Sequence, residues 1–127
     1  MRNKQQRPTD AELEILEVLW ASGPSTVREV HSAISVRRET HYTTILKLMQ
    51  IMLVKELVDR ETKQRSHVYR AKRKAELTQR QLVKDLVSRA FGGSANRLVM
   101  QALQVQKISA DEIEAIRELL DDLEKAE

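Results

Sequence analysis

The stretch from Thr40 to Val54 carries the side chains with the clearest capacity for chemistry. Its hydroxyl, imidazole, phenol and ammonium groups gather in the first half, at His41, Tyr42, Thr43, Thr44 and Lys47. On a helix, Thr43 and Lys47 would stand one turn apart on the same side. Small hydroxyls and one cation suit contact with base edges in a DNA groove. An ordinary core helix with a solvated edge would explain the same residues, and this stretch alone leaves both interpretations open.

Side chains for catalysis or metal binding are sparse elsewhere. The chain has no cysteine, which excludes disulfides, thiolate metal sites and a cysteine nucleophile. His31, His41 and His67 are scattered, and no pair has the i, i+4 spacing of a helical metal site. No phosphate-binding glycine loop or serine nucleophile motif occurs. We therefore predict a protein that is not an enzyme, with no catalytic residues, no metal site and no cofactor.

Two predicted helices precede this stretch and would position it. Thr9 and Glu12 have capping-box spacing, which predicts a helix from about Asp10 to Ala21, before a Ser-Gly-Pro break. Thr26 and Glu29 repeat that spacing at the start of a second, shorter helix. Both helices would lie directly before the polar stretch, as in a helix-turn-helix.

The apolar positions of these segments predict one shared core. Ile45, Met49 and Met52 recur at four and three residues, so they lie on one face of the central helix. The single tryptophan, Trp20, falls on the apolar stripe of the first helix. We expect it to be a packing residue.

Two strand-like runs follow the central helix. Residues 57–62 and 66–71 are predicted as strands of a hairpin, with Lys63-Gln64-Arg65 as the linker. Three helices followed by a hairpin is the element order of a winged helix-turn-helix, whose second motif helix enters the major groove. Some cations are placed for phosphate contact, although each could be a solvated surface charge. They are Arg28, Arg37, Arg38, Lys55 and Arg65.

The sequence from residue 75 onward predicts three helices without a nucleic-acid signature. Gly92-Gly93 ends the first, Ser94 can cap the second, and Ser109 with Glu112 forms a capping box for the third. About 50 residues are too few for a comfortable core of their own, so we expect a second copy of the chain to cover them. Folding back onto the N-terminal domain is the alternative. The apolar residues expected in dimerisation are Leu98, Leu103, Ile113, Ile116, Leu120 and Leu123.

Charge divides the chain at the same place. The net charge of +3 combines +6 over residues 1–74, from 15 Lys or Arg against 9 Asp or Glu, with −3 over residues 75–127, from 7 against 10. We predict a mainly α fold with a small β-hairpin wing. A winged helix-turn-helix DNA-binding domain would occupy residues 1–74 and a three-helix dimerisation domain residues 75–127. A winged-helix module that contacts protein or RNA is the alternative, which the charge division disfavours.

No part of the sequence resembles a membrane or export segment. The longest apolar run is far shorter than a membrane span, and the N-terminal MRNKQQRP lacks the apolar core of a signal peptide. We expect a cytoplasmic protein without membrane insertion. The absence of cysteine fits a reducing cytosol.

Five motifs resemble the penicillinase-repressor (BlaI/MecI/CopY) family of bacterial transcriptional regulators: PTDAELEILEVLW, STVREVH, HYTTILKLM, SHVYRA and, more loosely, FGGSANRLV. The likeness spans nearly the whole chain from Pro8. It implies a dimeric repressor that blocks promoters at a palindromic double-stranded DNA operator, often of TACA/TGTA type, with a wing on the phosphate backbone or minor groove. Such repressors control β-lactamase genes or, in a copper-sensing branch, metal homeostasis, and their C-terminal regions form an intertwined homodimer.

The sequence departs from this family at several positions. Glu56 replaces a glycine before the wing, which puts the turn there in doubt, and Ile51 replaces an arginine, so one phosphate contact is expected to be missing. Relatives that respond to β-lactams are released when a membrane sensor metalloprotease cuts an Asn-Phe bond. That pair aligns with Gln101-Ala102, which predicts a protease partner of altered specificity or release without this cut. The cysteine-rich site of copper-responsive relatives is absent.

Overall fold

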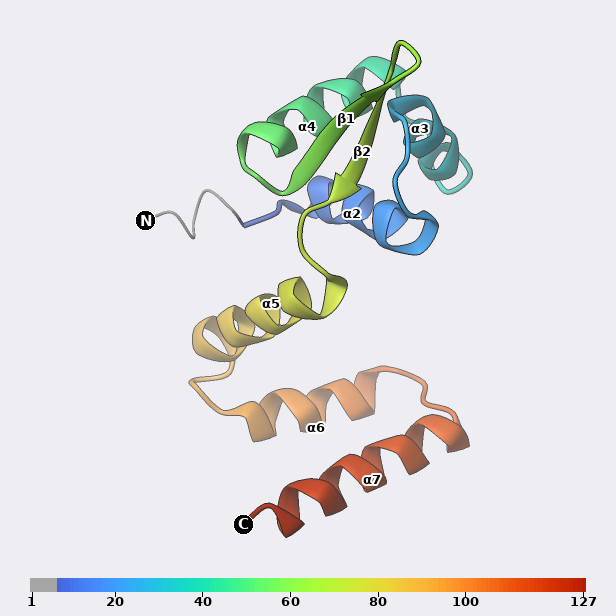
Figure 1. The fold of residues 1–127 in the computed structure, drawn as a ribbon. Coiled ribbons are helices and arrows are strands. Elements are labelled where there is room, and N and C mark those ends of the chain that lie inside the picture. Colours follow the sequence, from blue (N-terminus) through green and yellow to red (C-terminus); the bar gives the residue numbers. More distant parts are fainter. Residues whose placement is uncertain (1–6) are drawn as a thin grey trace. The chain divides into compact units, whose positions relative to one another are not determined.

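The structure is a computed structural model that describes residues 7–127 and consists of two compact units (Figure 1). The first unit ends at Arg80, and the second spans Gln81–Glu127. Residues 1–6 of the predicted N-terminal domain lie outside the described residues. The helix α5 (Ala75–Ala90) begins in the first unit, directly after the boundary predicted at residue 74, and continues into the second.

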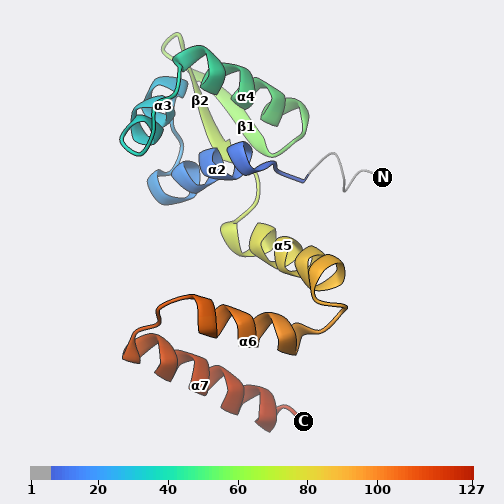
Figure 2. The same ribbon diagram turned by 180° about the vertical axis from the view of Figure 1, so that it is seen from behind.

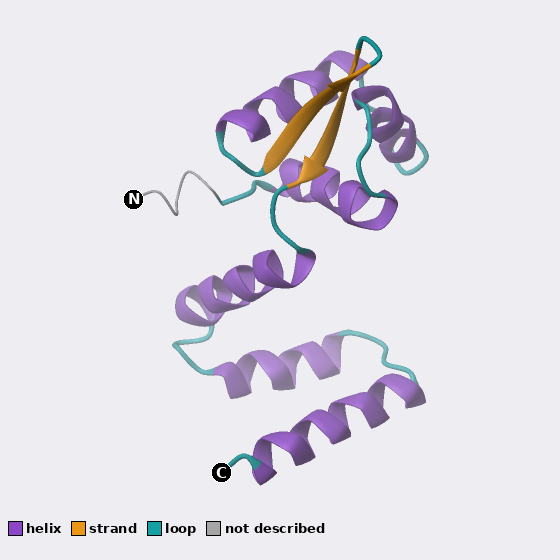
Figure 3. Cartoon of the chain, in the orientation of Figure 1, coloured by secondary structure: helices purple, strands orange, loops and turns teal. Residues whose placement is uncertain are grey.

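The first unit contains three helices and a hairpin, in the predicted order (Figure 3). Its elements are α2 (Asp10–Ser22), α3 (Val27–Ser35), α4 (Tyr42–Val54), β1 (Val58–Lys63) and β2 (Ser66–Ala71). The helix α2 contacts α3, α4 and β2, while α4 also contacts α3 and β1. This arrangement confirms the predicted winged helix-turn-helix fold, mainly α with a small β-hairpin.

Local hydrogen bonds explain where these helices begin. Thr9 Oγ1 accepts from the Glu12 N–H at 3.2 Å, and Glu12 Oε1 accepts from the Thr9 N–H at 2.9 Å. Thr26 and Glu29 make the same reciprocal pair before α3. Both predicted capping boxes are therefore confirmed. His41 stands before α4 without a side-chain cap hydrogen bond, so this helix starts without such help.

A Schellman motif ends α4. The Leu57 N–H donates to Met52 O at 2.9 Å, and the Glu56 N–H donates to Leu53 O at 3.1 Å. This motif requires a left-handed residue, and Glu56 takes a φ of 63°. Glycine usually fills such a position because a Cβ is strained there. The Glu therefore preserves the turn at a cost in stability.

The hairpin is antiparallel and has a tighter loop than predicted. Lys63 pairs with Ser66, which leaves only Gln64-Arg65 in the loop. These two residues have φ values of 48° and 72°, as a type I′ turn requires. The predicted first strand began at Leu57, but β1 begins at Val58 because Leu57 belongs to the turn that ends α4.

A short bridge ties the hairpin to the segment before α3. Ser25 and Tyr69 exchange two backbone hydrogen bonds of 2.8 Å each. The buried Tyr69 side chain thus sits where β2 meets both this segment and the core. The bridge fixes the root of the wing relative to the helices.

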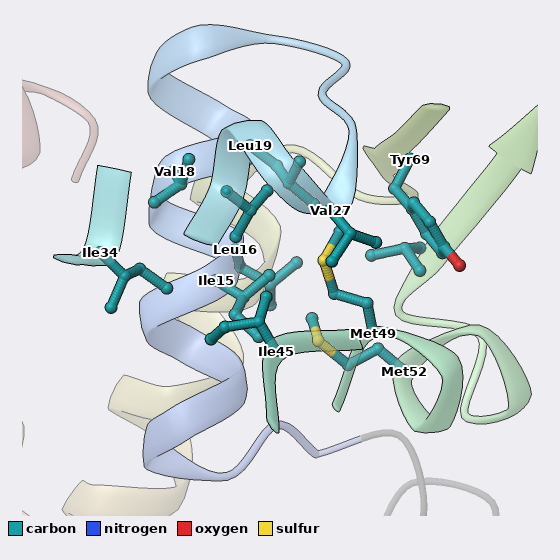
Figure 4. Close-up of a cluster of buried hydrophobic side chains, with 12 residues drawn as sticks. Ile15, Leu16, Val18, Leu19, Val27, Ile34, Ile45, Met49, Met52 and Tyr69 are labelled. Atoms are coloured by element: carbon teal, nitrogen blue, oxygen red, sulfur yellow. The ribbon is translucent and has the colours of Figure 1, made fainter. Parts of the chain in front are cut away.

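The core of the first unit lies between its three helices and the hairpin (Figure 4). Apolar side chains from all of these elements are almost fully buried, which explains why the amphipathic pattern of the sequence predicts the fold. Trp20 packs against this core and is partly buried, as expected. The buried set is Ile15, Leu16, Val18, Leu19, Val27, Val30, Ile34, Ile45, Met49, Met52, Val58 and Tyr69.

The second unit contains the rest of α5, α6 (Ala95–Val105) and α7 (Ala110–Lys125) (Figure 2). Ser94 caps α6, and Ser109 with Glu112 forms the predicted capping box of α7. Across α5, α6 and α7, all of which are described, no side chain is buried by this chain alone. Among residues 7–127, no helix is long and apolar enough to cross a membrane, and no acidic or histidine cluster is placed for a metal.

Candidate nucleic-acid interface

The helix α4 separates an apolar face from a polar one. Ile45, Met49 and Met52 have 0% exposure and dock the helix on the core (Figure 4). Positions 43, 44 and 47 recur at three and four residues and share another side of the helix. The polar row consists of the side chains predicted to contact bases, all of which are exposed: His41, Tyr42, Thr43, Thr44 and Lys47. Packing thus fixes a helix whose polar row faces solvent.

His31 supports the start of α4 from α3. Its Nε2 lies 2.8 Å from Thr40 O, the carbonyl just before the helix. Since a carbonyl only accepts, Nε2 must carry the proton in this contact. The ring also meets Tyr42 edge-on, at a centroid distance of 6.0 Å and an angle of 82°. No sequence pattern indicated this role for His31, because its partners Thr40 and Tyr42 follow the turn between α3 and α4.

Two predicted phosphate-contact residues stand exposed on the elements beside α4. Arg28 lies on α3, and Arg65 lies in the wing loop. Near that loop, Thr62 and His67 pair across the hairpin, with Thr62 Oγ1 3.0 Å from His67 Nδ1. The pairing braces the outer part of the wing. Both arginines are exposed to solvent, and their phosphate contacts stay a prediction.

Arg37 and Arg38, in the turn between α3 and α4, pair with carboxylates of α2. Arg38 grips Glu14 through two nitrogens, with Nη2 2.6 Å from Oε1 and Nε 3.1 Å from the same oxygen. Arg37 Nη1 lies 3.8 Å from Glu17 Oε1. The hydrogen bond from Arg38 lowers the pKa of Glu14 below its usual range. A phosphate would have to share or replace these carboxylates.

Lys55 is engaged inside the first unit. Its Nζ lies 2.7 Å from Glu12 Oε1 and 3.0 Å from Arg7 O. The Glu12 side chain is only 3% exposed, and a buried carboxylate needs such a partner. This ion pair ties the start of α2 to the end of α4. The structure shows Lys55 in this intrachain ion pair, and its phosphate contact stays a prediction; no local sequence pattern links residues so far apart.

These features define a winged helix-turn-helix domain, a class in which the exposed helix and the wing commonly bind DNA. The family model described as penicillinase repressor matches residues 8–122, and the chain belongs to this family. Its members are transcriptional repressors, which confirms the predictions of family and of a non-enzymatic role. The five motifs therefore identified the family correctly.

Relatives resemble this chain over nearly its whole length. The transcriptional regulator BlaI of Mycobacterium tuberculosis is 33% identical over 122 residues, which cover 95% of this chain and 88% of the relative. The penicillinase repressor of Staphylococcus aureus is 24% identical, with 98% and 99% of the two chains covered. A solved homodimeric winged helix-turn-helix domain from Mycobacterium bovis aligns with a TM-score of 0.49 and 21% identity, over 74% of this chain and 82% of that chain.

Proposed function

We propose that this chain is a dimeric repressor that binds a palindromic DNA operator. The observation that carries the proposal is the exposed polar row at the start of α4, a helix that is docked on the core through a fully buried face. Small hydroxyls and one ammonium can approach base edges in the major groove when the helix is held rigidly. Membership of the penicillinase repressor family supports the repressor role.

The proposed contacts with DNA are of two kinds, with bases and with phosphates. Thr43, Thr44 and Lys47, together with His41 and Tyr42, would face base edges and supply sequence preference. The arginines at positions 28, 37, 38 and 65 would contact phosphates and set the position on the duplex. Positions 37 and 38 would exchange their carboxylate partners on α2 for phosphate oxygens. Such contacts give an affinity that falls steeply with salt.

The second unit supports the dimeric part of the proposal. Leu103, Leu120 and Leu123 are 39%, 53% and 57% exposed, with Ile113 at 41%, and Leu98 and Ile116 are half-buried. Covering apolar surface contributes about 25 cal/mol per Å², so these faces favour a partner. A second copy of the chain would cover them and present two α4 helices to two half-sites.

The test combines selection of DNA with a measurement of assembly. Full-length protein is incubated with randomised duplexes, and the bound fraction is sequenced. We expect a palindrome with two half-sites, and sedimentation is expected to show a dimer at micromolar concentration. A selected motif without twofold symmetry, or a monomer that binds as tightly as the dimer, would contradict the proposal. RNA binding in preference to duplex DNA would favour the alternative interaction module.

Relief of repression by a cut in the second unit belongs to the same proposal. Gln101-Ala102 lies inside α6, and both side chains are exposed. A cut in this region would unlink the two half-site contacts, so operator affinity would collapse. Because the Asn-Phe pair is replaced, release would need a sensor protease of altered specificity or would not depend on this bond.

A further inference from the structure

The connection between the wing and α5 is short and hydrogen-bonded. Only residues 72–74 separate β2 from α5. The Lys72 N–H donates to Leu57 O at 3.0 Å, and Lys72 Nζ donates to Glu56 Oε1 at 2.9 Å. One residue further, the Trp20 indole N–H donates to Arg73 O at 2.9 Å. We call the five residues that make these hydrogen bonds the linker clasp: Trp20, Glu56, Leu57, Lys72 and Arg73.

The linker clasp reaches both α4 and the core. Glu56 and Leu57 form the turn that ends α4, and the Leu57 N–H is itself bonded to Met52 O of that helix. Trp20 stands on α2, where its ring packs against the core. An indole N–H only donates, so Trp20 fixes the linker through one defined acceptor. Lys72 and Arg73, the first two residues of this connection, are thereby tied to the elements that hold α4.

We propose that the linker clasp determines which distance between operator half-sites the repressor accepts, with Trp20 as its positioning residue. The inference rests on the dimeric operator binding proposed above. A dimer senses half-site spacing only if the path from α4 to the dimerisation helices is stiff, since a flexible linker lets each domain find its half-site at several spacings. Inserting one base pair turns the second half-site by roughly 35° about the DNA axis.

The central experiment compares wild-type protein with Trp20→Phe, which keeps an aromatic ring but removes the N–H donor. Affinities are measured for the palindromic duplex recovered by selection, for versions lengthened by one and two base pairs, and for an isolated half-site. We expect the preference of the variant for the original spacing to fall about 2- to 10-fold, the equivalent of one hydrogen bond. Affinity for the half-site should stay within the error of the measurement.

Two further variants separate positioning from loss of stability. Ile34→Val removes one buried methylene on α3, which contributes no residue to the linker clasp, and it should leave the spacing preference at the wild-type value. Lys72→Gln removes the ion pair with Glu56 and should weaken the preference in the same direction as Trp20→Phe. Equal losses on every duplex, including the half-site, would show that Trp20 is merely structural and would overturn the inference.

Hydrogen exchange of the linker amides distinguishes failure of this inference from failure of the proposed function. Trp20→Phe should speed exchange of the Lys72 amide about 2- to 10-fold, whether or not the protein binds an operator. Unchanged exchange together with an unchanged spacing preference would overturn the role of Trp20. A wild-type protein that binds a half-site as tightly as the palindrome would instead overturn dimeric operator binding, and the spacing role with it.

Discussion

Lys47 lies in the polar row of α4, where one ammonium can be tested for base recognition. Lys47→Ala should weaken binding to the selected operator by about 1 to 3 kcal/mol and relax the preference at one base position. Binding to random duplexes should change much less, because they offer no matched base. Titrations of both duplexes at one fixed salt concentration measure this difference.

Arg65→Ala is the matched comparison in the wing. We expect Arg65 to contact phosphate, so its loss should weaken all duplexes alike and flatten the logarithmic salt dependence by about one unit of slope. Equal losses of specific and random binding in the Lys47→Ala protein would show that Lys47 contacts phosphate and reads no base.

Glu56 has a left-handed backbone conformation that is strained for a residue with a Cβ atom. It keeps the positive φ of a Schellman turn, here 63°, although glycine is preferred there. Glu56→Gly should raise the midpoint of thermal unfolding by about 2 to 4 °C, because relief of the strain exceeds the loss of an exposed ion pair with Lys72. Glu56→Ala is the control: it loses the same ion pair but keeps the strained Cβ. A midpoint as high for Ala as for Gly would refute this explanation.

At the scale of elements, features that depend on residues close in the sequence, such as the starts of helices, were predictable. The capping boxes at Thr9 and Thr26 each involve a partner three residues away, and both are present. The strand and loop limits were predicted less accurately, because hairpin pairing decided whether Lys63 belongs to β1. Residue 56 has the positive φ that favours glycine, although glutamate stands there.

Contacts between distant elements could not be predicted in the same way. Glu12 is the capping-box partner of Thr9, yet it also binds Lys55, 43 residues away, through a buried pair. Trp20 was expected to pack, which it does, but its N–H bond to Arg73 depends on where β2 ends. Periodicity identifies which face of a helix is buried, whereas the partner of a polar group depends on the packing of whole elements.

The pairing of α2 with the turn before α4 predicts a pH effect on stability. The folded state lowers the pKa of Glu14 from 4.5 through its bond to Arg38, so the unfolded chain binds a proton more readily. This contribution is present above about pH 5 and is lost as pH falls through the folded pKa. Glu14→Gln should therefore show a shallower loss of stability below pH 5, with a difference of about 0.5 to 1 kcal/mol at pH 7.

Urea denaturation from pH 3 to 7 measures this effect. Arg38→Gln should flatten the same pH interval, because it removes the donor that lowers the pKa of Glu14. The double variant should be no flatter than either single variant, since one interaction is removed in each case. Additive changes would mean that Glu14 acts through a group other than Arg38.

At the scale of the whole molecule, α7 offers the sharpest test of assembly. Leu120→Asp would place a charge on the apolar face of this helix, where burial at an interface costs several kcal/mol. Leu120 lies in the second unit and is 53% exposed in the single chain, so the first unit should remain folded. We expect sedimentation to show a monomer and operator affinity to collapse, while half-site affinity persists. Asp121→Asn on the same helix serves as the control, and a dimeric Leu120→Asp protein would exclude this face from the interface.

Under the proposed relief of repression by proteolysis, a protease would have to cut α6. Gln101-Ala102 lies within Ala95–Val105, so its peptide groups are helical and a protease must first unwind them. Alanine also leaves a pocket shaped for phenylalanine empty, which forfeits on the order of 3 kcal/mol, or about 100-fold in cleavage rate. We expect a sensor protease from a β-lactam-responsive system to cut this chain poorly and the double variant Gln101→Asn, Ala102→Phe efficiently.

Equal helical content of the two proteins by circular dichroism controls for unwinding. Fragment masses that show rapid cleavage of the wild-type chain between Gln101 and Ala102 would refute the requirement for an altered protease.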